Sequence, residues 1–104
     1  MTDIQVLPDP SRLRYQASID GEVAGFVEYI LTDELIVFTH TEVHPRFEGR
    51  GVGSAIARFA LDDVRATGSR KVMPLCPFIK GWIGRHREYV PIVYGVPEPA
   101  KDNR

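Results

Sequence analysis

The pattern of apolar and polar residues predicts β-strands in the first part of the chain. Over 12–19, large apolar residues alternate with polar ones, a period of two that is typical of a half-buried strand. Asp20-Gly21 is a hairpin turn sequence, and Thr32-Asp33 indicates a second turn. We therefore expect an antiparallel meander of three strands, at 12–19, 22–31 and 34–43.

Two features of this part depart from simple alternation. Residues 1–11 contain Pro8 and Pro10, which favour turns, so we expect a lead-in with room for a short edge strand at 4–6. Gly25 lies inside the second strand, where a glycine marks a bulge or a close approach of another backbone.

From residue 52 the apolar period becomes helical. Apolar residues recur at helical spacing, at Val52, Ile56, Phe59, Ala60 and Val64. Gly68 is placed to end this helix as its C-terminal cap. The short apolar run at 71–75 should then lie parallel to the strand ending at 43, because a strand reached through a helix returns by a right-handed crossover. Pro74 places that strand at an edge, or makes it part from its neighbour.

The last third of the chain predicts a second helix. Pro77 suits the first helical position, and the helical pattern continues to Tyr89, although Gly81 and Gly84 weaken it. A brief strand is expected at 92–94, followed by a flexible tail at 95–104. The order of elements predicts a compact α/β (α+β) fold made of an antiparallel meander, a helix, a splayed parallel strand and a second helix.

Composition restricts the chain to one domain, 1–104, and argues against several functions. A chain of 104 residues buries one core, and a net charge of −1 provides no field for nucleic acid or an anionic membrane. The single cysteine excludes an internal disulfide and a zinc-type cluster, so we expect a reducing, cytoplasmic location and no metal. No segment has the length of a membrane span, and we expect a monomer or weak dimer.

The glycine-rich loop at 49–53 is the first candidate for chemistry. Glycines let successive backbone N–H groups converge on an anion at a helix N-terminus, where the helix dipole also favours negative charge. A turn that only packs a strand against a helix explains the glycine spacing equally well. The loop lacks the lysine of a P-loop and the spacing of a dinucleotide fingerprint, so a pyrophosphate bound without a metal fits it best.

The carboxyl ends of the two parallel strands bring three further groups toward this loop. His40 and Glu42 are two residues apart on one strand, so they share a face, and Cys76 ends the other strand just before a helix. The helix dipole favours a thiolate at Cys76. Two plainer interpretations stay open: Cys76 as a small buried apolar residue, and His40 as a buried histidine bonded to backbone.

Two segments of the chain resemble a known family. These are H-T-E-V-H-P-R-F-E-G-R-G-V-G-S-A-I-A and V-M-P-L-C-P-F-I-K-G-W-I-G-R-H-R-E-Y, and both are similar to the small, YjdJ-type branch of the GCN5-related N-acetyltransferases (GNAT). The resemblance covers about 19–89 and implies two strands that splay to hold acetyl-CoA. It assigns cofactor binding to Val43, Arg46, Gly49, Arg50, Gly51, Val52, Gly53, Ser54, Cys76 and Phe78. Glu48 departs from the usual glutamine or arginine at the first place of the loop motif.

The resemblance implies an acetyl-CoA-dependent N-acetyltransferase acting on an unidentified amine. Glu42 would take the amine proton with help from His40, and a backbone N–H near Val43 would polarise the carbonyl. Cys76 would either protonate the CoA thiolate or accept the acetyl group first. The alternatives are a CoA-binding or protein-interaction module without turnover and a structural domain that binds no ligand.

Overall fold

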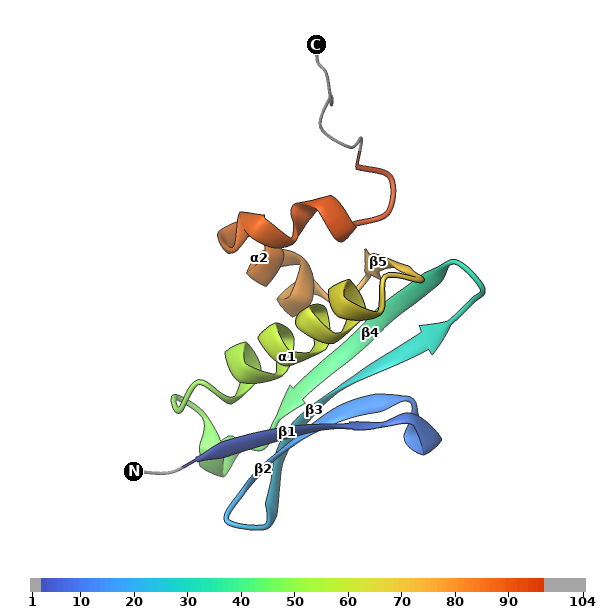
Figure 1. Cartoon of the computed structure of the whole chain (residues 1–104). Helices are drawn as coiled ribbons and strands as arrows, with labels where there is room; N and C mark the ends of the chain where they lie inside the picture. The colour runs from blue at the N-terminus through green and yellow to red at the C-terminus, as the bar shows by residue number, and fades with distance from the viewer. Residues whose placement is uncertain (1–2, 97–104) are drawn as a thin grey trace.

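The computed structural model describes residues 3–96 and contains one five-stranded sheet in the order β1-β2-β3-β4-β5, with two α-helices (Figure 1). The strands are β1 (Ile4–Asp9), β2 (Arg14–Ile19), β3 (Glu22–Leu31), β4 (Leu35–Val43) and β5 (Lys71–Pro74). The helices are α1 (Val52–Thr67) and α2 (Pro77–Arg85). Single 3-10 turns occur at η1 (Pro10–Arg12) and η2 (Pro45–Phe47), and a longer 3-10 segment is η3 (Arg87–Ile92).

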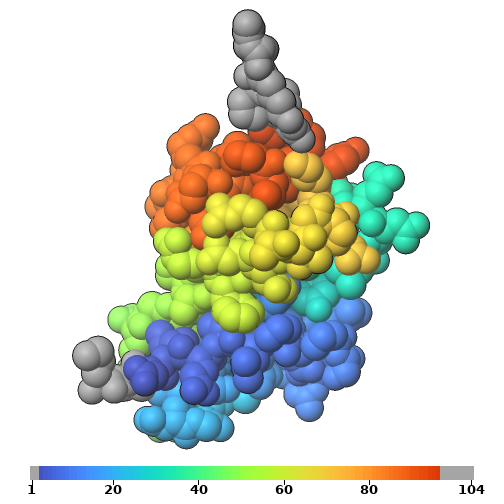
Figure 2. Space-filling model, in the orientation of Figure 1, coloured from blue at the N-terminus to red at the C-terminus, as the bar shows by residue number. Residues whose placement is uncertain are grey.

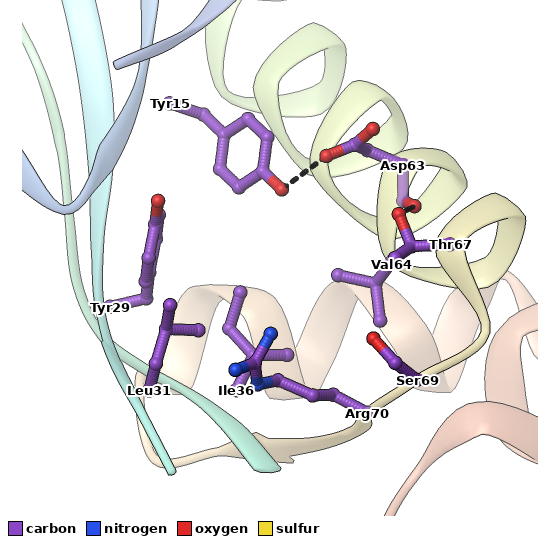
Figure 3. A pocket seen from close by; sticks show the side chains of 9 residues that line it. All are labelled: Tyr15, Tyr29, Leu31, Ile36, Asp63, Val64, Thr67, Ser69 and Arg70. Carbon is purple, nitrogen blue, oxygen red and sulfur yellow. Dashed lines mark hydrogen bonds between the residues drawn. The ribbon is translucent and has the colours of Figure 1, made fainter. Parts of the chain in front are cut away.

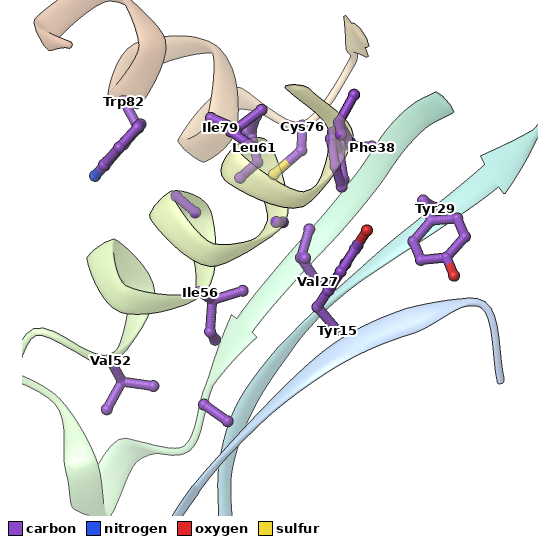
Figure 4. Packing of buried hydrophobic residues seen from close by; sticks show 14 of the residues in the cluster. Tyr15, Val27, Tyr29, Phe38, Val52, Ile56, Leu61, Cys76, Ile79 and Trp82 are labelled. Atoms are coloured by element: carbon purple, nitrogen blue, oxygen red, sulfur yellow. The ribbon is translucent and has the colours of Figure 1, made fainter. Parts of the chain in front are cut away.

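Helix α1 covers one face of the sheet. The core between them is built from alternate residues of the strands and from the apolar stripe of α1 that the sequence predicts, including Val27, Phe38 and Ile56 (Figure 4). In the space-filling view α1 lies between the N-terminal strands and the C-terminal segment (Figure 2). Within the described residues, no helix is long and apolar enough to span a bilayer.

The central elements confirm the predicted order. Strands β2 to β4 form the antiparallel meander, and β5 pairs in parallel with β4. Asp20 and Gly21 have φ of 51° and 79°, as a tight hairpin turn requires. Gly68, with φ of 75°, ends α1. The predicted compact α+β fold with a splayed parallel strand is therefore the observed one.

The N-terminal expectation needs correction. The expected lead-in is a full strand, because β1 pairs with β2 along all six of its residues. Pro8 is tolerated there because β1 is the edge of the sheet, where an N–H group is not needed on the open side. Strand β2 begins at Arg14 instead of residue 12, since Leu13 adopts a left-handed φ of 53° after η1.

The C-terminal expectations also need correction. Helix α2 ends at Arg85, short of Tyr89, because the His86 side chain takes the place of the next backbone donor. The Nδ1 atom of His86 lies 2.8 Å from the carbonyl oxygen of Trp82, whereas its backbone N–H donates to Ile83. The expected strand at 92–94 is reduced to one bridge between Val72 and Val93, after η3. Of the expected tail, 97–104 lies outside the described residues.

Strands β4 and β5 part where Pro74 predicts it. Their pairing stops at Phe38 and Pro74, and the N–H groups of Leu75 and Cys76 both donate to the Phe38 carbonyl, at 3.1 and 2.9 Å. One carbonyl thus ends the ladder, and the chain turns away into α2. The last part of β4, from Thr39 to Val43, has no β5 partner and borders a gap.

Gly25 is required by the packing of β3 on β4. A bulge at Ala24 precedes it, and a Cβ atom at Gly25 would lie 2.6 Å from the Glu42 carbonyl oxygen and 3.2 Å from Val52. Both predicted features, a bulge and a close backbone approach, are therefore found at this point.

We expect Gly25→Ala to reduce the free energy of unfolding by about 1–3 kcal/mol, because backbone atoms must move to admit the methyl group. Gly84→Ala is the matched control: the site is helical, nothing lies within 4 Å, and the substitution should stabilise by up to about 1 kcal/mol. Urea unfolding of both variants measures the difference. Equal stability of the two variants would contradict the role of Gly25.

Candidate functional site

The glycine-rich loop presents free backbone N–H groups at the start of α1. Gly49 and Gly51 have φ of 82° and 80°, values that side chains other than glycine rarely adopt. Gly51 is the N-cap, and its carbonyl accepts the first helical bond from Ala55 at 3.0 Å. The N–H groups of residues 52–54 therefore have no helical acceptor, and they carry the positive end of the helix dipole.

A cleft of about 360 Å³ lies in front of these N–H groups. It lies between the loop and α2, and it is lined by Val43, Phe47, Glu48, Gly49, Gly51, Val52, Gly53, Ser54, Phe78, Trp82, Arg85 and His86. The Phe78 ring stands over Gly53, where a Cβ atom would lie 2.8 Å from the ring. Seven of the ten residues assigned to acetyl-CoA from the sequence thus line one cleft; Arg46, Arg50 and Cys76 do not.

Helix α2 forms a fixed wall of this cleft. The Nε1–H of Trp82 donates to the Ser54 hydroxyl at 2.9 Å, which ties α2 to the first turn of α1. The His86 ring stacks on Trp82 at 3.8 Å between centroids. Because the Trp82 carbonyl can only accept a hydrogen bond, His86 carries a proton on Nδ1, and its Nε2 is free of that bond.

The arginines near the loop have different surroundings. Arg46 donates to the Glu22 carboxylate at 2.6 Å, and Arg50 lies with its guanidinium 5.6 Å from the centre of the Phe47 ring. Arg85, which the sequence analysis did not single out, is the cation that lines the cleft. The sequence could have indicated it, because residue 85 falls at helical spacing from 78 and 82 and therefore lies on the same face of the predicted helix.

The gap between β4 and β5 leads from the cleft to the end of β4. The N–H of His44 donates to Ala24 on β3 at 2.8 Å. Because successive N–H groups of a strand point to opposite sides, the N–H of Val43 points away from β3 into the gap. A backbone donor thus faces the gap at the residue that the sequence analysis expected to polarise a carbonyl.

Cys76 is buried beside this gap. It is the N-cap of α2, is 3% exposed, and its Sγ lies 3.1 Å from the hydroxyl of Thr41 (Figure 4 shows its place between α1 and β4). Thr41 is a second residue that the sequence analysis missed. A threonine near the end of a strand is common, so nothing in the sequence pointed to a contact with Cys76. The thiol is thus small, packed and hydrogen-bonded, as the plainer interpretation expected.

His40 and Glu42 lie on the opposite face of β4. Thr41 pairs with the fully buried Val27 under α1, so its two neighbours point to the uncovered face. The Nε2 of His40 is 3.2 Å from the Glu42 carboxylate, and both side chains are more than half exposed. The two residues do share a face, and His40 is not the buried histidine of the alternative.

The groups named from the sequence are therefore arranged on two sides of one strand. The cleft, Cys76 and Thr41 are on the face that α1 covers, whereas Glu42 and His40 are on the open face. The pairing of β4 with β5 ends between these groups and the start of the strand, at Phe38. Within the described residues, no group of three or more potential metal ligands is present.

Comparisons with known proteins concern the family and the fold of the chain. Residues 14–92 match a family model described as GCN5-related N-acetyl-transferase. No curated protein sequence matches the chain.

Two solved structures share the fold. One is the solution structure of a GCN5-like putative N-acetyltransferase from Staphylococcus aureus, with a TM-score of 0.68 and 17% identity over 99% of this chain and 100% of the other. The other is the crystal structure of ribosomal-protein-alanine N-acetyltransferase from Brucella melitensis biovar Abortus 2308, with a TM-score of 0.55 and 19% identity over 88% of this chain and 67% of the other.

Proposed function

The chain belongs to the GCN5-related N-acetyltransferases, and from this membership we propose that it transfers an acetyl group from acetyl-CoA to an amine. One observation carries the proposal: unpaired N–H groups at the start of α1 face a cleft that opens onto the gap between β4 and β5. The location is cytoplasmic in this proposal, as a single free cysteine suggests.

The cleft would hold the donor by its pyrophosphate. The N–H groups of residues 52–54 supply hydrogen bonds and the helix dipole supplies positive potential, so no metal is needed. Arg85 stands across the cleft and adds positive charge. Phe78 and Val43 border the path from the loop to the gap and would contact the pantetheine arm.

The chemistry would take place in the gap. The amine nitrogen attacks the thioester carbonyl carbon, the carbon–sulfur bond breaks, and the CoA sulfur leaves as a thiolate that takes up a proton. Glu42 on the open face accepts the proton that the amine loses, and His40, at 3.2 Å, positions that carboxylate and can pass the proton on. The Val43 N–H stabilises the oxygen as negative charge develops on it.

In this proposal the acetyl donor and the amine acceptor reach the gap from opposite faces of the sheet, so their binding sites do not overlap. The thioester reaches the gap from the covered face, whereas the amine approaches Glu42 from solvent. Within residues 3–96 no helix covers the open face of the sheet, so this proposal accommodates a large or a small acceptor.

CoA should raise the melting temperature of the protein. At 100 times the dissociation constant the stabilisation is about 2.7 kcal/mol, a rise of roughly 10 °C for a domain of this size. Gly51→Val should abolish the rise, whereas Gly68→Val, which strains an equally left-handed residue at the other end of α1, should preserve it. No shift for the unaltered protein would rule out both the enzyme and the CoA-binding module.

Glu42→Gln should lower kcat/KM by about 10²–10⁴ without changing the CoA-induced thermal shift, because the carboxylate lies outside the cleft. Thiol release from acetyl-CoA, measured with a panel of polyamines, lysine and peptides, gives the rate. Raising the pH should partly restore the variant, since more of the amine is then neutral. Glu34→Gln, an exposed residue before β4, is the control. A CoA shift without turnover of any amine would favour the binding module.

Acetyl-CoA alone should leave no acetyl group on Cys76. The thiol is 3% exposed and bonded to Thr41, which suits a proton donor or a packing residue better than an acyl acceptor. Intact-protein mass after incubation with acetyl-CoA measures this, with Cys76→Ala as the blank. An adduct that is absent from Cys76→Ala and is consumed by an amine would establish the covalent route instead.

A further inference from the structure

The gap between β4 and β5 is open at one end and closed at the other. At the open end, Val43 lines the cleft in front of the glycine loop. At the closed end, the N–H groups of Leu75 and Cys76 converge on the Phe38 carbonyl. Phe38 and Val43 are five residues apart on β4, so the gap is roughly 15 Å long. A thioester that enters from the cleft therefore points toward the closed end.

Thr41 and Cys76 meet across the gap before its closed end. The hydroxyl of Thr41 lies 3.1 Å from the Sγ atom of Cys76, which joins β4 to the N-cap residue of α2. Thr41 pairs with the fully buried Val27, so its side chain is on the face that α1 covers. Val43, two residues along the strand, shares that face. The Thr41–Cys76 contact thus lies between Val43 and the closed end on the covered side.

The protein is tightly packed behind the Thr41–Cys76 contact. Phe38, Leu61 and Ile79 are each 0% exposed, and Figure 4 shows them around the Cys76 sulfur. The cleft in front of the glycine loop reaches the open end of the gap, and neither residue of the contact lines it. A ligand atom beyond the contact would have to displace buried side chains, which costs free energy in a close-packed interior.

A second cleft does not extend this gap. It has a volume of about 160 Å³ and lies at the far end of α1, where the helix approaches the hairpin between β3 and β4 (Figure 3). The Phe38 ring separates it from the gap, because that ring packs against Tyr15 and Tyr29 of the cleft wall at 6.5 and 6.3 Å between centroids. Neither Thr41 nor Cys76 lines this second cleft. An acyl chain in the gap therefore cannot continue into it.

The spacing along β4 sets the length of acyl chain that fits. In the proposed mechanism the thioester oxygen lies at the N–H of Val43. Residues two apart on a strand are separated by about 6–7 Å, and non-bonded carbon atoms approach to about 3.5 Å, so about 3 Å remains before Thr41. A carbon–carbon bond is about 1.5 Å long, so the acyl chain can add at most about two bonds beyond its carbonyl carbon. Acetyl and propionyl groups stay within this limit, whereas a hexanoyl group exceeds it.

We propose that the Thr41–Cys76 contact restricts the acyl donor to acetyl or propionyl thioesters. The two side chains act by filling space, so Thr41 determines specificity without taking part in proton transfer. The role of the contact rests on the proposed function, because the position of the thioester comes from it. Binding of CoA at the glycine loop does not depend on the contact, since neither Thr41 nor Cys76 lines that cleft.

The first experiment is a calorimetric titration of the full chain with CoA, acetyl-CoA and hexanoyl-CoA. Acetyl-CoA should bind at least as tightly as CoA, because its acyl group ends before the contact. Hexanoyl-CoA should bind at least about tenfold more weakly than acetyl-CoA, because its chain must displace buried side chains or pull the thioester away from Val43.

Variants test the assigned residues. Thr41→Ala removes the hydroxyl and a methyl group from the contact, so it should reduce the acetyl-to-hexanoyl affinity ratio at least about threefold. Thr41→Val has nearly the same shape and should keep the ratio. Thr39→Ala is the matched control, because Thr39 is exposed on the same strand and its hydroxyl bonds to the Glu28 carbonyl at 3.3 Å. Thermal unfolding checks that each variant is folded; if Thr41→Ala is not, Cys76→Ala, which opens the contact from the other side, decides.

The proposal fails if the unaltered protein binds hexanoyl-CoA as tightly as acetyl-CoA. It also fails if Thr41→Ala and Thr39→Ala change the ratio equally, or if Thr41→Val changes it as much as Thr41→Ala, since volume would then not decide. Failure of the proposed function looks different, because CoA itself would then not bind. Normal binding of CoA and acetyl-CoA without discrimination against hexanoyl-CoA contradicts only the role of the Thr41–Cys76 contact.

Discussion

The architecture of the site depends on the point where β5 stops following β4. Two N–H groups, from Leu75 and Cys76, share the carbonyl of Phe38, and beyond them no ladder is possible because the chain enters α2. The unpaired end of β4 then keeps backbone donors that a continuous sheet would consume. In a protein interior such donors would be costly, and here they border a gap that a ligand can fill. The parting of the strands is thus both the end of the sheet and the origin of the site.

The same turn fixes the second wall of the cleft. Pro77 starts α2 immediately after Cys76, and the helix carries Trp82 back to Ser54 in the first turn of α1. Tyr89, in η3, then bonds to Asp62 at 2.6 Å farther along α1. Arg58 of α1 also donates to the Tyr89 hydroxyl at 3.2 Å, so the C-terminal segment is attached to α1 at several points. These bonds hold one side of the cleft in place before any ligand binds, which lowers the ordering cost of binding.

Sequence reasoning succeeded where a local rule decides the outcome. The alternation of β2 to β4, the glycine that ends α1 and the proline that ends the β4–β5 ladder are each dictated by nearby residues. It was incomplete where side-chain or long-range bonding decides: β1 extends beyond the expected 4–6 because β2 pairs with all six of its residues, and α2 stops because the His86 side chain bonds to the Trp82 carbonyl.

The functional site shows the same division. The sequence placed the loop glycines directly before a helix, and their positive φ values explain why glycine is needed there. Their role as an anion site stays a prediction. Arg85 and Thr41 were not singled out, since a helical arginine and a strand threonine are common and only the fold brings them to the cleft and to Cys76.

Strand period alone places His40 and Glu42 on one face, but it does not say which face α1 covers. That assignment makes β4 a partition: the cleft lies on its covered side, and the Glu42 carboxylate lies on its exposed side, in contact with water. In the proposed mechanism a general base on the covered face would lose that contact with water, so the division suits the proposed acetyl transfer better than a single crowded pocket would.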